Sequence, residues 1–93
     1  MNCIIYVSDN CDISIYQQFN KAARYAKRYG YSVKSKMLDF SNSEFYKAVD
    51  KVVFDSEVDA LIVYNLNSIG DFETALFYRI YLEKFGKKLI SCN

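Results

Sequence analysis

Residues 59–71 read DALIVYNLNSIGD, and they contain the strongest fold signal in this chain. The apolar run from Ala60 to Tyr64 predicts a buried strand. The polar segment from Asn65 to Asp71 then predicts a loop that leads into a new helix. In an α/β protein, a loop at the carboxyl end of a strand is where binding and catalysis are normally placed.

The rest of the chain continues this alternation of strand and helix. Apolar runs and alternating patterns predict strands at residues 3–7, 31–38, 58–64 and 88–91, with 31–38 at a sheet edge. Apolar residues at helical spacing predict helices at 15–29, from the segment 41–44 to about residue 54, and at 72–85. In the last of these helices we expect an inward face made of Ala75, Leu76, Ile80 and Leu82 or Phe85.

Capping signals support these boundaries. Ser14–Gln17 and Ser41–Glu44 both have the form of a capping box, which opens a helix. Gly30 and Gly86 follow the first and third helices, where a left-handed residue ends a helix. The order βαβαβαβ requires right-handed crossovers. It therefore predicts a three-layer α/β/α sandwich around a mostly parallel four-stranded sheet.

Composition fits one small domain that covers residues 1–93. The chain is 52% apolar and 17% aromatic, which is enough for a packed core without disulfides. Three cysteines at irregular spacing, with no histidine, predict neither a disulfide framework nor a zinc site. We expect no metal and no cofactor. The chain has no apolar run long enough to cross a membrane, and its first residues read directly into a strand. We therefore expect the protein in the cytoplasm.

Polar residues follow each of the first three predicted strands. They are Ser8–Asn10, residues 39–42 and Asn65–Asp71, and parallel strands bring such ends to one edge of the sheet. Ser8, Asn10, Ser41 and Ser68 either line a neutral polar pocket there or, as we favour, cap loops and form turns. A phosphate-cradling loop is excluded after the first strand, because residues 8–14 contain no glycine. A Ser-His-Asp triad is excluded because the chain has no histidine.

These segments resemble the catalytic domain of serine recombinases, the resolvases and invertases. The family pattern "vDalvvy-x-LDRlgR" is similar to Val58–Asp71, and its final strand is similar to Gly86–Ser91. The family's Asp-x-x-Ser-Gly resembles Asp39–Asn42, one residue shorter and without the glycine. The match extends over nearly the whole chain and implies a resolvase-like fold.

The first strand aligns with the family in two ways. Counted without gaps from Tyr6, Ser8 falls at an arginine position and Asn10 at the nucleophile. With two residues deleted, Ser8 is the nucleophile instead. The family's glutamine corresponds to Gln17 or Gln18, depending on this choice.

The departures from the family concern its catalytic arginines. The four expected arginines fall at Ser8, Glu44, Ser68 and Asp71, of which two are acids. Arginines in such a site bind the scissile phosphate, and the loss of one preorganised charge typically costs about 10²–10³ in rate. The resemblance therefore implies a catalytically inactive, truncated domain with no catalytic residues. Its vestigial active-site positions are Ser8, Asn10, Glu44, Ser68 and Asp71.

Two surfaces offer other uses. The first predicted helix has a basic outer face made of Lys21, Arg24, Lys27 and Arg28, which suits a nucleic-acid backbone or a solvated surface. The third carries more apolar side chains than one sheet face can bury. We therefore expect a homodimer, through Phe77, Tyr78 and Tyr81 of this helix or through the edge of the strand at 88–91.

We expect a regulator that acts by protein–protein contact and derives from a phage or mobile element, as the family resemblance implies. Its partner would be a recombinase or a host regulator. The alternative is a small nucleic-acid-binding module that uses the basic face, and the least favoured is an enzyme with new chemistry at Ser8 or Asn10.

Overall fold

A computed structural model describes residues 1–41 and 43–93 of the chain. Four strands form one sheet in the order β2-β1-β3-β4, and each neighbouring pair is parallel. The strands are β1 (Asn2–Ser8), β2 (Ser32–Asp39), β3 (Ala60–Val63) and β4 (Lys88–Ser91). The predicted α/β architecture is confirmed, and β2 is an edge strand as expected.

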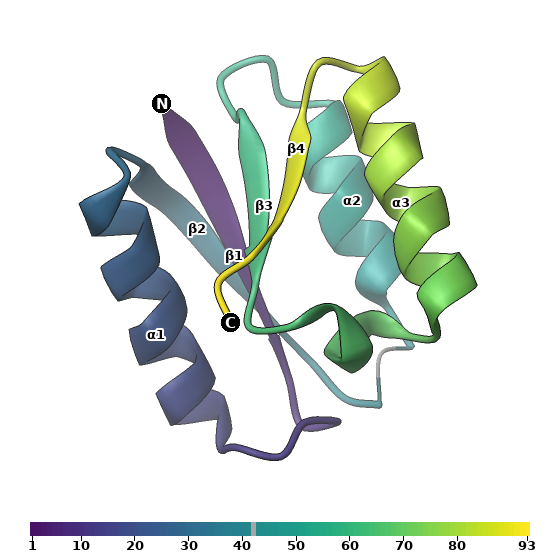
Figure 1. Cartoon of the computed structure of the whole chain (residues 1–93). Helices are drawn as coiled ribbons and strands as arrows, with labels where there is room; N and C mark the ends of the chain where they lie inside the picture. The colour runs from purple at the N-terminus through teal and green to yellow at the C-terminus, as the bar shows by residue number, and fades with distance from the viewer. Residues whose placement is uncertain (42) are drawn as a thin grey trace.

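Three α-helices connect the strands. They are α1 (Ile15–Arg28), α2 (Phe45–Val53) and α3 (Phe72–Lys84). Helix α1 covers one face of the sheet, while α2 and α3 cover the other, so the molecule has three layers (Figure 1). A short 3-10 helix, η1 (Leu66–Ile69), lies in the segment that was predicted to be a loop.

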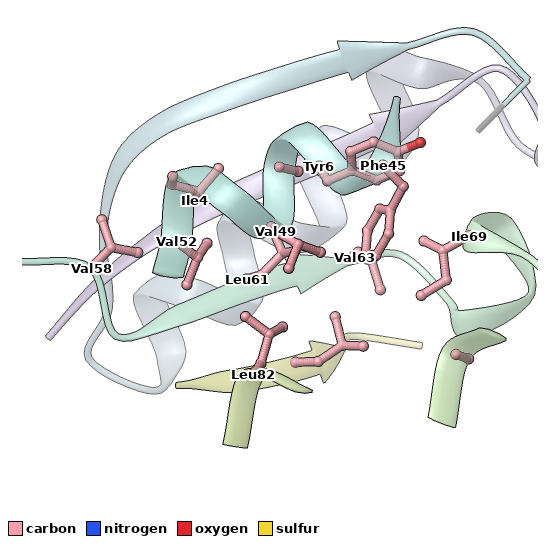
Figure 2. Packing of buried hydrophobic residues seen from close by; sticks show 13 residues of the cluster. Ile4, Tyr6, Phe45, Val49, Val52, Val58, Leu61, Val63, Ile69 and Leu82 are labelled. Carbon is pink, nitrogen blue, oxygen red and sulfur yellow. The ribbon is translucent and has the colours of Figure 1, made fainter. Parts of the chain in front are cut away.

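The larger core cluster lies between the sheet and α2 and α3. Ile4 and Tyr6 of β1, Leu61 and Val63 of β3, and side chains from both helices pack there (Figure 2). The Tyr6 ring meets the Phe45 ring edge-on, with centroids 4.8 Å apart. Each fully buried aliphatic or aromatic side chain contributes about 1.5–3 kcal/mol. These contacts hold β1 and β3, whose carboxyl ends carry the polar residues discussed below.

Three of the four predicted helix caps are confirmed. Ser14 forms the expected capping box with Gln17, and Gly30 and Gly86 have φ of 79° and 72° after α1 and α3. The predicted Ser41–Glu44 box is wrong in its described residues. Glu44 occupies the N-cap position and makes no side-chain cap hydrogen bond, while Ser41 has φ of 58°. Asn42, the remaining member of that box, lies outside the described residues.

The inward face predicted for α3 is only partly correct. Ala75 and Leu82 are buried, but Leu76, Ile80 and Phe85 are exposed. The reason is that α3 sits over β4 and beside α2, so Tyr78 and Tyr81, rather than Leu76 and Ile80, pack against the core. The helix consequently presents large apolar side chains to solvent.

Candidate functional site

The carboxyl ends of β1 and β3 open onto a shallow polar cavity of about 530 Å³. Its lining comes from the segments after these two strands: Asp9, Asn10, Cys11, Asp12, Asn65, Asn67 and Ser68. Of the four residues considered for a neutral pocket, Asn10 and Ser68 line this cavity. Two aspartates make the cavity acidic, and no lysine or arginine is among its described lining residues. An anionic phosphate is therefore repelled from this edge.

Ser8 does not reach this cavity, because its side chain is fully buried, with 0% exposed. Its Oγ accepts a hydrogen bond of 3.2 Å from the Asn10 N–H. A nucleophilic serine must approach a phosphorus atom, and this one faces the interior of its own loop. The structure thus places Asn10 at the cavity and Ser8 beneath it.

Gln18 fixes the position of Ser8. Its Oε1 accepts from the Ser8 N–H at 3.2 Å, and its Nε2 donates to the Ser8 and Ile13 carbonyls at 2.7 and 3.1 Å. The Gln18 side chain is buried, whereas Gln17 is used in the capping box of α1. Of the two glutamines considered from sequence, Gln18 is therefore the one that organises the β1–α1 loop.

A second polar network joins the ends of β1 and β2. The Asp39 carboxylate accepts from the Tyr6 hydroxyl at 2.7 Å, the Phe40 N–H at 2.7 Å and the Glu44 N–H at 2.9 Å. Burial raises the pKa of Asp39, but these hydrogen bonds outweigh it and leave the pKa below its ordinary value. Burial, followed by the bond to Asp39, raises the pKa of Tyr6. Asp39 is thus an ionised structural group with both oxygens engaged.

Asp39 also explains the failure of the predicted capping box. Its carboxylate binds the Glu44 N–H at the start of α2, which leaves the Glu44 side chain free to point outward. There the Glu44 carboxylate forms an ion pair of 3.0 Å with Lys47. The Glu44 side chain therefore forms a surface ion pair at the start of α2 and does not cap the helix.

Ser68 and Asp71 stabilise the backbone between β3 and α3. The Ser68 Oγ donates to the Asn65 carbonyl at 2.7 Å, and the Asn65 Oδ1 accepts from the Ser68 N–H at 2.9 Å. Asp71 caps α3 by accepting from the Thr74 N–H at 2.8 Å. The bonds to Thr74 lower the pKa of Asp71. Both residues therefore have a local structural role.

The basic face of α1 borders a groove of about 350 Å³. Lys21, Arg24 and Arg28 line it together with Tyr25, Tyr29, Cys92 and Asn93. Lys27, the fourth predicted cation, is exposed on α1 but is not in this lining. Sequence reasoning missed the tyrosines as part of this surface. Their signal was an interleaved pattern, in which a tyrosine directly follows Arg24 and another directly follows Arg28.

Helix α3 presents a separate apolar surface, made of Phe72, Leu76, Phe77 and Ile80. Phe72 is 80% exposed and Phe77 is 61% exposed. Tyr78 and Tyr81, the other residues of the predicted dimer interface, are half-buried, and Tyr78 packs edge-on against Phe45 at 5.0 Å. The accessible apolar surface is therefore centred on Phe77 and on the outer side of α3.

Other kinds of site find no support in the described part of the chain. Residues 1–41 and 43–93 contain no group of three histidine, cysteine or acidic side chains placed to hold a metal ion. Among the same residues, no helix has the length and apolar character needed to cross a membrane.

Comparison with solved structures identifies the fold. The C-terminal catalytic domain of ISC1926 TnpA, an IS607-like serine recombinase, superposes with a TM-score of 0.82 at 19% identity, over 100% of this chain and 68% of that one. The N-terminal catalytic domain of TP901-1 integrase gives 0.84 at 20% identity, over 100% and 78%. The C-terminal catalytic domain of IS1535 TnpA, also IS607-like, gives 0.74 at 11% identity, over 97% and 70%.

The chain therefore has the fold of a serine-recombinase catalytic domain, which confirms the resemblance. Identities of 20% and below show the fold alone. No protein-family profile matches the sequence, and no curated protein is similar to it in sequence.

Proposed function

We propose that this chain is a recombinase-fold domain that does not cleave DNA and that acts by binding other proteins, including a second copy of itself. One observation carries the proposal: Ser8 is buried below an acidic cavity that has no cation among its described lining residues. Strand cleavage needs an accessible nucleophile and positive charge around the scissile phosphate. The edge of this sheet supplies neither.

The residues at the four arginine positions support the same conclusion. Each has a structural partner: Ser8 accepts from Asn10, Glu44 pairs with Lys47, Ser68 bonds to Asn65, and Asp71 caps α3. Groups placed in this way stabilise loops and helix ends. The sheet edge thus has a structural role, and we assign the function of the domain to its outer surfaces.

The outer side of α3 is the surface best suited to protein contact. Phe72, Leu76 and Ile80 recur four residues apart, so they form one stripe along the helix, and Phe77 lies beside it. Exposed aromatic side chains are typical of interface centres. In a two-fold dimer, the stripe of one copy packs against the same stripe of the other, so the exposed apolar side chains of both copies leave the solvent. Phe77 is then an interface residue, with Tyr78 and Tyr81 supporting it from below.

The comparisons support an origin in a phage or mobile element and a regulatory role there, because two similar domains come from IS607-like recombinases and one from an integrase. Such a domain would work in the cytoplasm beside a recombinase or a host regulator. Because the fold is shared, a recombinase could bind this chain as it binds a second copy of its own catalytic domain.

Light scattering coupled to gel filtration tests the dimer. The chain is expected to shift from monomer to dimer mass with increasing concentration, and Phe77→Asp should remain a monomer. Tyr16→Asp is the matched control, since Tyr16 is an exposed aromatic residue on α1, across the sheet from α3. Monomeric wild type at every concentration, or equal loss in the control, would rule out this interface.

Incubation with supercoiled plasmid tests the absence of cleavage. No nicked product and no covalent protein–DNA species should appear, and Ser8→Ala should behave like the wild type. Nicking by the wild type that disappears in Ser8→Ala would refute the proposal.

A second candidate function has its own support. The groove beside α1 gathers three cations, which favours a nucleic-acid-binding module.

A further inference from the structure

We infer that the groove between α1 and the segment after β4 binds single-stranded nucleic acid, through phosphate contacts to Lys21, Arg24 and Arg28 and base contact with Tyr29. The inference rests on the second candidate function and names its ligand. It does not involve the α3 surface or the acidic cavity. The groove combines uncompensated positive charge with an exposed aromatic ring.

The charge of the groove is one-sided. Its three cations lie at positions 21, 24 and 28, one helical turn apart, so they project along one flank of α1. No acidic side chain is among the described lining residues, and within the described chain none of these cations forms an ion pair. Burial raises the pKa of the Cys92 thiol, so that neighbour adds no negative charge at neutral pH. The charged side chains among the described lining residues are therefore all cations, which attract an anionic backbone.

The aromatic part of the groove indicates unpaired bases. Tyr25 and Tyr29 lie against one another with ring centroids 4.4 Å apart, and Tyr29 is 53% exposed. The Arg28 guanidinium carbon lies 5.8 Å from the centroid of the Tyr29 ring. A base that stacks on the exposed part of Tyr29 thus places its phosphate beside Arg28. Stacking of this kind requires a base face that a duplex does not offer.

The placement of α1 also disfavours a duplex. The helix lies flat on the sheet, and its buried side is occupied by Gln18, Ala22 and Ala26 (Figure 1). With that side against the sheet, α1 offers a duplex only its outer face, which limits how far it can enter a major groove about 12 Å wide. A groove of about 350 Å³ along its flank instead suits a few consecutive nucleotides of one strand.

Fluorescence anisotropy with labelled dT12 and U12 tests this inference. Three phosphate contacts predict that log K falls with log salt concentration with a slope of about −2, from about −0.7 for each contact to a single strand. Arg24→Glu with Arg28→Glu should reduce binding at least tenfold. The matched control is Lys51→Glu with Lys84→Glu, which makes the same change in net charge on exposed lysines of α2 and α3. The control should bind nearly as well as the wild type at moderate salt.

Variants at Tyr29 distinguish the contribution of base stacking to affinity from that of charge. Tyr29→Ala should weaken binding about fivefold or more, since stacking on one aromatic side chain is worth about 1–3 kcal/mol per base. Tyr29→Phe should bind like the wild type. An equal loss of affinity in the arginine double variant and in the lysine double variant would show that the groove is not the binding site. An unlabelled DNA duplex that competes as well as dT12 would overturn the preference for single strands and leave nucleic-acid binding intact.

The same assay on Phe77→Asp keeps the two proposals apart. Full binding by this variant shows that the groove works without the α3 surface. Failure of dimerisation with intact dT12 binding would refute the protein-contact proposal alone.

Discussion

The Tyr6 hydroxyl and the Asp39 carboxylate form a buried hydrogen bond of 2.7 Å that joins the ends of β1 and β2. Both side chains are almost completely inaccessible, and Asp39 is only 3% exposed. A charge at that depth is tolerated because hydrogen-bond donors surround it. This pair therefore determines how the loop after β2 leaves the sheet and where α2 begins.

Removal of the Tyr6 hydroxyl should destabilise the fold. Tyr6→Phe leaves a buried carboxylate with one donor fewer, and a hydrogen bond to a charged group is worth about 1.5–3 kcal/mol. The free energy of unfolding, measured in urea, should fall by that amount. In a double-mutant cycle with Asp39→Asn, the two losses should be clearly less than additive. Additive losses would mean that the two residues do not interact.

The lowered pKa of Asp39 predicts a loss of stability in acid. A carboxyl group whose pKa is lower in the folded than in the unfolded protein stabilises the fold above its unfolded pKa, near 4. That contribution is lost as the pH falls through the lowered pKa of the folded state. Unfolding free energies measured between pH 7 and pH 2.5 should decline more steeply for the wild type than for Asp39→Asn. Equal slopes would contradict the role assigned to Asp39.

Gln18 should control the order of the β1–α1 loop. Gln18→Leu keeps the volume of the side chain but removes three hydrogen bonds to backbone groups. An unsatisfied buried polar group costs about 1–3 kcal/mol, so a loss in this range is expected. Amide exchange should accelerate at residues 8–13. Gln17→Leu, at a more exposed neighbouring position, should affect only the start of α1.

Lys87 should stabilise the connection between α2 and β3. Its ammonium group donates to the carbonyls of Asp55, at 2.9 Å, and of Val58. Lys87→Met retains most of the alkyl chain and removes both bonds, so we expect a loss of about 1–3 kcal/mol in thermal or urea unfolding. Lys84→Met, at an exposed position of α3, is the matched control and should have little effect. The same small effect in both variants would argue against this role.

Sequence reasoning was most successful where local signals determine the structure. The Ser14 capping box, the left-handed Gly30 and the buried β3 run each depend on residues near in sequence, and each was confirmed. The strand and helix order then left few possible topologies. The parallel sheet with helices on both faces followed from that order.

The errors arose where distant residues compete for the same groups. Ser41–Glu44 has the pattern of a capping box, but Asp39, held by Tyr6 from the neighbouring strand, takes the Glu44 N–H instead. Ser8 was one of four candidate pocket residues, but Gln18 and Asn10 hold it in the interior, in line with the loop-capping role that we favoured. These outcomes depend on which strands are neighbours and how deeply each residue lies, and a one-dimensional pattern contains neither.

The position of β1 has a consequence for how the chain acquires its structure. Residues 2–8 precede all their pairing partners in the sequence, yet they lie between β2 and β3 in the sheet. No strand pair can form as a local hairpin, so folding must bring together segments separated by whole helices, which slows it. The chain contains no proline, so no peptide-bond isomerisation should add a slow phase. Refolding kinetics of the monomeric Phe77→Asp variant should therefore report the closure of these crossovers.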